Sequence, residues 1–218
     1  MLAVLPDPAA TVIATAAYTG ARRGELRGML WENYKAGEIL IAQSVWQTHI
    51  TEPKSPKSKA PVPIIPRLAS CLDLLRECQG SPSSGPMFPN ELGRPCDLNN
   101  LLNRTILPIL NRCELCKKSE LEHEGEQHRY QRDSSVPEWR GWHAFRRGLA
   151  TNLHRIGVDD KTIQLILRYA NVVTTPNIYI KSVSKDAREG MARLEQQISL
   201  WDSNRTVDPA NSDTKMVM

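Results

Sequence analysis

The 218-residue sequence contains no long uninterrupted apolar segment and no recognisable secretion signal. A transmembrane helix needs roughly 20 consecutive apolar residues, and no apolar run in the chain approaches that length. Met1 is not followed by a charged segment and an apolar run of the kind that begins a signal peptide. We therefore expect a soluble protein in the cytoplasm, with no membrane partner.

Cysteine is scarce and odd in number. Five cysteines in a chain without a secretion signal argue against a disulfide scaffold and favour reduced thiols or a metal site. Cys71 and Cys78 lie in the amphipathic segment RLASCLDLLREC, where their spacing predicts that they face the core. Cys113 and Cys116, in contrast, have the Cys-x2-Cys spacing of metal ligands.

Neither sign of charge dominates the chain. The 28 Lys and Arg residues against 24 Asp and Glu residues give a net charge of +4. That balance permits a polyanionic partner without requiring one, so the positions of the cations matter more than their sum. With 40% hydrophobic residues, the chain can bury a core as one large or two small domains.

The pattern of apolar residues predicts an α+β fold that is mainly α. Asp7, Pro8 and Gly20 bound a first helix as cap, first-turn proline and stop. Further helices are expected at 22–30, 67–78, 98–111, 143–157, 159–170 and 185–201, with a short helix opened by Thr175 and Pro176. The β-branched segments 37–53 and 60–66 predict a small antiparallel sheet of two or three strands. We expect one folded domain over 1–202 and a disordered tail over 203–218.

Several basic motifs suit the chemistry of a phosphodiester. In HAFRR, helical spacing places His143 on one face with Arg146 and Arg147, and TGARRGEL holds a second arginine pair. Each pair alone is more typical of a solvated surface. A turn between two expected strands adds Lys54, Lys57 and Lys59. Arginine forks stabilise phosphate oxygens, lysine and histidine transfer protons, and a tyrosine can act as nucleophile.

Together these motifs resemble those of the tyrosine recombinases, the phage integrase family, in its catalytic domain. The resemblance runs in order from about residue 3 to residue 200, and it is specific because four separated motifs agree. The motifs are TGARRGEL…WENY, PKSPKSKAPVPI, WHAFRRGLATNLHRIGVDDKTIQLIL and NVVTTPNIYIKSV.

The resemblance implies a role for each matching residue. The family pattern Thr-Gly-x-Arg selects Arg22 over Arg23 and gives Glu25 a supporting role, and His-x-x-Arg selects His143 with Arg146. The hairpin lysine falls on Lys54, with Lys57 as the alternative. The nucleophilic tyrosine falls on Tyr179.

The implied activity is that of a site-specific DNA recombinase or integrase. Such an enzyme cuts double-stranded DNA through a 3′-phosphotyrosyl bond and rejoins it to another 5′-hydroxyl, with chemistry like that of type IB topoisomerases. No ATP, cofactor or catalytic metal is required, which agrees with the lack of a P-loop. The resemblance also implies a homo-oligomer on DNA. Family members usually carry an N-terminal core-binding domain, whereas this sequence opens at the catalytic motifs, so we expect weak DNA binding.

Tyr169 departs from the family pattern. The resemblance would place a phosphate-binding histidine there, at the end of Leu-Gly-His, but the sequence reads Leu167-Arg168-Tyr169. A phenol can also donate a hydrogen bond, so Tyr169 remains a candidate catalytic residue. The alternatives are a catalytically degenerate DNA-binding remnant of an integrase and an interaction module without a DNA role.

A polar insert at 112–138 is a candidate zinc loop. It holds Cys113, Cys116, His123 and His128, four potential metal ligands within sixteen residues. The histidine spacing fits a structural zinc site, although the segment between Cys116 and His123 is shorter than in a DNA-reading finger. The alternative is a charged, solvated loop.

Overall fold

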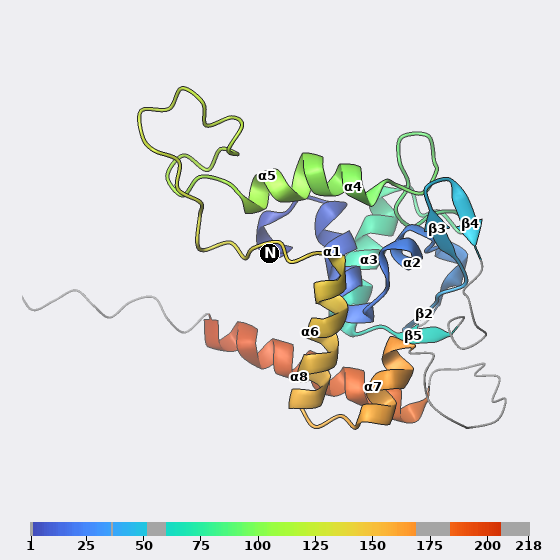
Figure 1. The fold of residues 1–218 in the computed structure, drawn as a ribbon. Coiled ribbons are helices and arrows are strands. Elements are labelled where there is room, and N and C mark those ends of the chain that lie inside the picture. The colour runs from blue at the N-terminus through green and yellow to red at the C-terminus, as the bar shows by residue number, and fades with distance from the viewer. Residues whose placement is uncertain (1, 36, 52–59, 169–183, 206–218) are drawn as a thin grey trace, which may run out of the picture.

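The computed structural model describes residues 2–35, 37–51, 60–168 and 184–205. It is mainly helical, with two small antiparallel sheets at one side of the helices (Figure 1). The α+β, mainly α class predicted from the sequence is therefore confirmed. Lys54, Lys57, Tyr169, Tyr179 and the short helix expected from Thr175 lie outside the described residues.

The helices follow the expected order along the chain. They are α1 (Ala9–Thr19), α2 (Arg23–Arg27), α3 (Pro66–Cys78), α4 (Leu98–Leu101), α5 (Leu107–Leu110), α6 (Trp142–Arg155), α7 (Asp160–Leu167) and α8 (Lys185–Arg205). Short 3-10 turns η1 (Leu2–Val4) and η2 (Trp31–Asn33) and the π-helical turn η4 (Leu102–Ile106) complete the described helical segments. No helix in these ranges is long and apolar enough to cross a membrane.

Helix α1 is largely buried, and most of its side chains are the small ones of alanine and threonine. It packs against α3 and α6 (Figure 1). Val12 belongs to the main hydrophobic cluster and Ile13 to a second one, so the helix divides two cores. Its threonine hydroxyls all donate hydrogen bonds: Thr15 and Thr19 to the carbonyls four residues earlier, at 2.7 and 2.6 Å, and Thr11 to the Asp7 carboxylate at 2.6 Å.

The strands form two units, whereas the sequence predicts one sheet. β1 (Tyr34–Lys35), β2 (Glu38–Leu40) and β5 (Pro61–Pro63) pair antiparallel in the order β1-β2-β5. β3 (Ser44–Trp46) and β4 (His49–Thr51) form a separate hairpin. The chain leaves β2 and runs against α2, where the Gln43 carbonyl lies beside Gly28. Helix α2 ends at Arg27 instead of continuing to about Leu30 because the backbone that follows pairs with another segment. The Met87 N–H donates to the Met29 carbonyl and the Trp31 N–H to the Gly85 carbonyl, both at 2.9 Å.

The last helix, α8, packs back on its own chain. Its buried side chains Met191 and Leu194 join the main cluster, and Arg67 pairs with Asp202 at 2.6 Å. On helix α3, Cys71 is half-buried and Cys78 is exposed. The prediction that Cys78 faces the core is therefore wrong, because Cys78 lies in the last turn of α3, beyond the buried Leu75.

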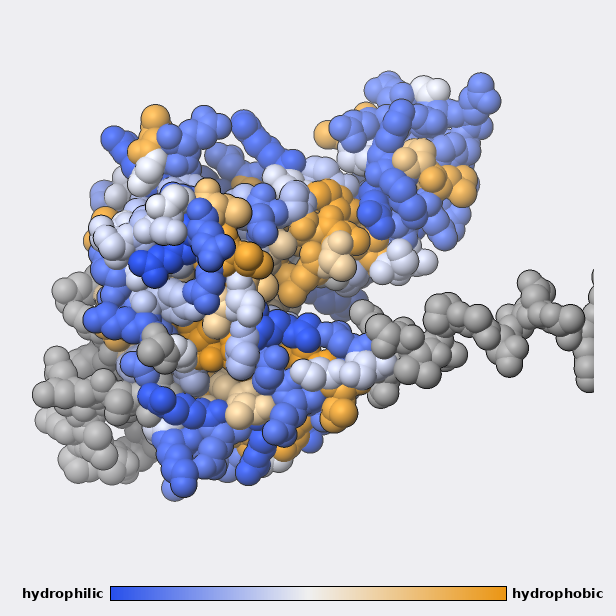
Figure 2. Space-filling model, turned by 180° about the vertical axis from the view of Figure 1, so that it is seen from behind, coloured by the Kyte–Doolittle hydropathy of each residue, from blue (hydrophilic) through white to orange (hydrophobic). Residues whose placement is uncertain are grey.

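The polar insert forms a lobe that projects from the body between α5 and α6 (Figure 1). We refer to residues 112–138 as the polar lobe. Its neck is closed by Asp133, whose backbone N–H donates to the Arg112 carbonyl at 2.9 Å. The Asp133 carboxylate also accepts from Arg112 at 2.9 Å and Lys117 at 3.0 Å. Figure 2 shows the lobe standing apart from the rest of the surface and largely hydrophilic.

Candidate active site

Arg22 is held at the surface by a buried carboxylate. The residue caps the start of α2, and the Glu25 Oε1 atom accepts from the Arg22 guanidinium at 2.7 Å. Glu25 Oε2 accepts from the Arg22 backbone N–H at 2.8 Å. The Arg22 side chain is 40% exposed while that of Glu25 is 6% exposed. The buried Glu25 carboxylate therefore holds the Arg22 guanidinium in place while the guanidinium remains accessible to solvent.

A second arginine reaches the same carboxylate from the far end of the chain. Arg168 follows α7 in a left-handed conformation, with φ of 55°. Its guanidinium donates to Glu25 Oε2 at 2.8 Å and is buried. Burial raises the pKa of Glu25, but the charge of Arg168 and the hydrogen bonds from Arg22 outweigh it and lower the pKa. Glu25 thus stays ionised between two cations.

Arg146 lies at the junction of three segments. From α6 it donates to the Gly20 carbonyl at 2.7 Å and to the Leu167 carbonyl at the end of α7. It is buried, whereas Arg147 is exposed. Gly20 is required here, since its φ is +60° and an added Cβ would lie 2.5 Å from a Leu167 methyl carbon.

His143 lies one turn before Arg146 in the first turn of α6, and its side chain is exposed. The three-residue spacing places both on one side of the helix. The structure thus brings Arg22, Arg146 and Arg168 into one charged cluster, because Arg22 and Arg168 share the Glu25 carboxylate and Arg146 donates to the Leu167 carbonyl next to Arg168. It does not describe the lysine or tyrosines that the sequence places with them.

Beside this cluster, the exposed side of α2 carries further cationic and aromatic groups. Arg23 lies over the Trp46 ring at 5.2 Å and donates to Asn99 at 2.8 Å. Trp46 is 57% exposed. A shallow hollow here is lined by Arg23, Arg27, Trp46, Gln47, Asp97, Leu98 and Asn99. Sequence reasoning missed both Trp46 and Arg168, whose partners are far away in the chain.

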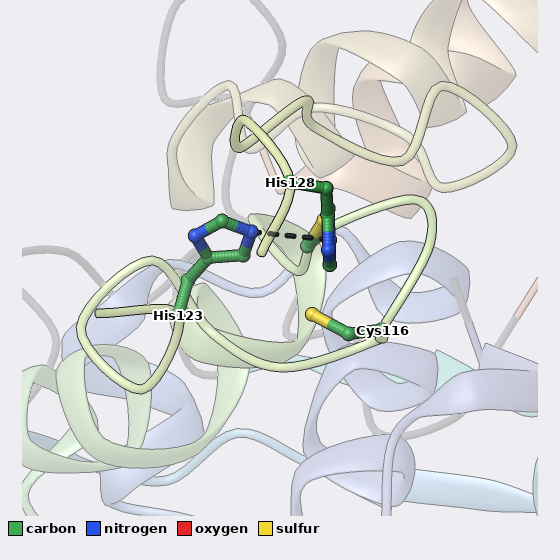
Figure 3. A group of neighbouring side chains, drawn as sticks. Cys116, His123 and His128 are labelled. Carbon is green, nitrogen blue, oxygen red and sulfur yellow. Dashed lines mark hydrogen bonds between the residues drawn. The ribbon is translucent and has the colours of Figure 1, made fainter. Parts of the chain in front are cut away.

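The polar lobe contains a separate group of potential metal ligands. The ligand atoms of Cys113, Cys116, His123 and His128 all lie within 4.8 Å of one another. Figure 3 shows the two imidazoles and the Cys116 side chain directed toward a common centre. Burial raises the pKa of the Cys113 thiol, but N–H groups of Gln131 and Cys116 and the His128 imidazole lower it to about 5.

Comparison with known proteins gives a consistent set of relatives. The profile described as "Phage integrase family" matches residues 5–185. A tyrosine recombinase XerC-like protein of Caldanaerobacter subterraneus subsp. tengcongensis is 27% identical over 203 residues, which cover 81% of this chain and 46% of that protein.

Two solved structures of the Tn1549 transposon integrase share the fold. The complex with circular intermediate DNA has a TM-score of 0.53 at 20% identity, over 85% of this chain and 59% of that one. The complex with transposon right end DNA has a TM-score of 0.51 at 17% identity, over 84% and 57%. The chain thus spans about half the length of its curated relative. Because the profile covers most of the sequence, the chain belongs to the phage integrase family of tyrosine recombinases.

Proposed function

We propose that this chain is a catalytic domain that cuts and rejoins double-stranded DNA at specific sites through a 3′-phosphotyrosyl intermediate on Tyr179. The observation that carries the proposal is the hydrogen bond from Arg146 to the Gly20 carbonyl, which holds Arg146 close to Arg22, two residues further along the chain. Family membership supplies the chemical context for this pair of arginines.

The electrostatics of the cluster favour a phosphate. Arg22 and Arg168 share the Glu25 carboxylate, and Arg146 donates to the Leu167 carbonyl next to Arg168. The fold therefore holds these guanidiniums in place before negative charge builds on the phosphate oxygens. Arg22 contacts those oxygens with its exposed guanidinium, and Arg146 contributes its charge from below.

The remaining residues complete the reaction. The Tyr179 oxygen attacks phosphorus and forms the phosphotyrosyl bond, while the bond to the 5′-oxygen breaks. Lys54, or Lys57 in its place, protonates that leaving oxygen, and His143 assists transfer of the phenol proton. Tyr169 donates a hydrogen bond to the phosphate. Attack by a 5′-hydroxyl of another strand reverses these steps, so the chemistry is like that of a type IB topoisomerase and consumes no ATP.

The DNA partner is supported by the solved relatives, which were determined as complexes of an integrase with DNA. The Arg23 and Trp46 surface beside the cluster offers a cation and a flat ring for further contacts. We propose that the protein acts in the cytoplasm, where its DNA substrate lies, and that copies assemble on that DNA.

Covalent capture tests this function without knowledge of the target sequence. The protein is incubated with a pool of nicked genomic duplexes, and DNA that stays attached after SDS treatment is isolated and sequenced. We expect adducts enriched in one recurring sequence, absent with Tyr179→Phe and strongly reduced with Arg22→Ala. Salt-sensitive DNA binding without any adduct would instead identify a degenerate remnant.

Tyr169→His provides a second test of the same site. If Tyr169 occupies the position of a phosphate-binding histidine, restoring the imidazole keeps or raises the rate of adduct formation. A large loss of adduct with an unchanged circular dichroism spectrum would contradict that assignment.

A further inference from the structure

Four side chains converge inside the polar lobe although they are dispersed along its sequence. Cys113 and Cys116 come from a tight turn in which the Lys117 N–H donates to the Cys113 carbonyl at 3.0 Å. His123 and His128 come from the opposite side of the lobe, and both present Nε2 to the centre (Figure 3). Cys113 and His123 are buried, at 0% and 8% exposure.

Two of the separations between these atoms are close to the edges of a zinc tetrahedron, and all four atoms lie within 4.8 Å of one another. Bond lengths of about 2.3 Å for Zn–S and about 2.0–2.1 Å for Zn–N give tetrahedral edges of about 3.6 Å for S···N and about 3.3 Å for N···N. The Cys113 Sγ to His128 Nε2 distance is 3.3 Å, and the His123 Nε2 to His128 Nε2 distance is 3.2 Å.

Ordinary hydrogen bonding accounts poorly for this geometry. The Nε2 atom of His128 is close to both the Cys113 sulfur and the His123 nitrogen. A neutral imidazole nitrogen carries either one proton or one lone pair, so it cannot make two well-directed hydrogen bonds of opposite sense. A cation at the centre accepts a lone pair from each atom and satisfies all of them together.

The lobe also lacks the apolar packing that would hold it closed. Its leucines Leu115 and Leu121 are 70% and 89% exposed. Within residues 112–138, all of which the structure describes, the buried side chains are those of Cys113, His123, Asp133 and Val136. Val136 packs in the second hydrophobic cluster with residues of the body, so it does not hold the outer part of the lobe closed. Asp133 closes the neck through Arg112 and Lys117. In the outer part of the lobe, the thiols and imidazoles are accompanied by polar contacts such as the ion pair between Lys118 and Glu126 at 2.5 Å.

We propose that Cys113, Cys116, His123 and His128 bind one Zn²⁺ ion in a tetrahedral structural site. Two thiolates with two imidazoles are a donor set typical of zinc, and four protein ligands leave no open position for catalysis. The ion links the turn at Cys113 to the histidine segment and replaces a hydrophobic core in the lobe. This role is separate from the proposed DNA chemistry.

Metal content of the purified chain tests the site directly. We expect about one zinc ion per chain by elemental mass spectrometry, retained through dialysis in reducing buffer. Cobalt added to the metal-free chain should give the visible absorption bands of tetrahedral Co²⁺ with thiolate ligands, and zinc should displace them. Less than a tenth of an equivalent of zinc, together with no cobalt spectrum, would refute the proposal.

Ligand variants with matched controls locate the ion. Cys116→Ser and His123→Asn should each weaken cobalt binding by more than the roughly 10–100-fold that loss of an outer-shell partner costs. Cys78→Ser removes an exposed thiol and His154→Asn an exposed imidazole outside the lobe, and both should bind metal like the parent chain. Equal binding by all four variants would place the metal elsewhere.

These measurements do not depend on DNA cleavage. A chain that forms no covalent adduct but holds one zinc would contradict the proposed function and leave the metal site standing. A chain that forms adducts but binds no metal would do the reverse. If a ligand variant fails to fold, the cobalt titration of the parent chain still decides the question.

Discussion

Arg168 supplies the charge that keeps the Glu25 carboxylate ionised behind Arg22. The two groups are 2.8 Å apart, and their side chains are 0% and 6% exposed. A buried ion pair adds modest net stability, but removing one partner leaves an uncompensated charge. Arg168 is therefore a positioning residue for Arg22, acting through the shared carboxylate.

Replacing Arg168 should expose this dependence. We expect Arg168→Met to lower the free energy of unfolding by about 3 kcal/mol, because Glu25 stays buried, loses its buried partner and keeps only the partly exposed Arg22. Urea denaturation measures the change. Arg155→Met, at an exposed position of α6, should alter stability by no more than about 0.5 kcal/mol. Similar values for the two variants would contradict a stabilising role for the pair.

Glu25 should also contribute to acid unfolding. Its pKa is lowered in the folded state from an ordinary value of 4.5. A group of this kind stabilises the fold fully above its unfolded pKa, and that stabilisation is lost as the pH falls through the folded pKa. The stability difference between the parent chain and Glu25→Gln should therefore stay constant well above pH 4.5 and shrink as the pH falls below 4.5 and through the lower folded pKa. Denaturation curves at several pH values measure it, and a constant difference would argue against the lowered pKa.

At the scale of elements, Gly20 controls how α1 meets the arginine cluster. Its positive φ ends α1, and its missing side chain admits Leu167. We expect Gly20→Ala to destabilise the fold by about 1–3 kcal/mol through backbone strain and the clash with Leu167. Thermal denaturation measures the loss.

Gly148 is the matched control for this substitution. It lies inside α6 with helical φ, and an added Cβ would meet nothing within 4 Å. Gly148→Ala should leave stability unchanged or raise it by up to about 1 kcal/mol, because alanine is the better helix former. Equal destabilisation by both substitutions would show that Gly20 has no special conformational role.

The starts of several helices were predictable from sequence because the capping residues lie next to them in the chain. Asp97 caps α4 by accepting from the N–H groups of Asn99 and Asn100, and Asp159 caps α7 in a similar way. The early end of α2 was not predictable, since it depends on backbone pairing of Met29 and Trp31 with the distant segment 85–87. Likewise, Arg168 and Glu25 are 143 residues apart, and nothing near either residue indicates their pairing.

For the whole molecule, the distribution of charge predicts how DNA binding responds to salt. The net charge is only +4, so affinity should come from local contacts such as those near Arg23. We expect binding to duplex DNA to weaken with increasing salt, and Arg23→Ala to reduce the slope of log K against log salt by about 1. Fluorescence anisotropy with labelled duplexes measures this. An unchanged slope would exclude Arg23 as a phosphate contact.

Some residues of the candidate site could be identified from contiguous sequence motifs, whereas others depend on contacts between distant parts of the chain. The motifs around Arg22 and His143 are contiguous in sequence, so a resemblance to known recombinases was enough to single them out. Sequence spacing suggested that the lobe's thiols and imidazoles bind a metal, but only the folded lobe shows that they lie around one centre. Trp46 became a candidate only when Arg23 was found over its ring.

The closed neck of the polar lobe has a practical consequence for protein engineering. Arg112 and Asp133 meet through a backbone hydrogen bond of 2.9 Å, so the chain enters and leaves the lobe at nearly the same place. The lobe is thus an interchangeable cassette: a short turn, a fluorescent reporter or another binding module could take its place between α5 and α6. Such grafts would test whether the recombinase body folds and acts without the lobe.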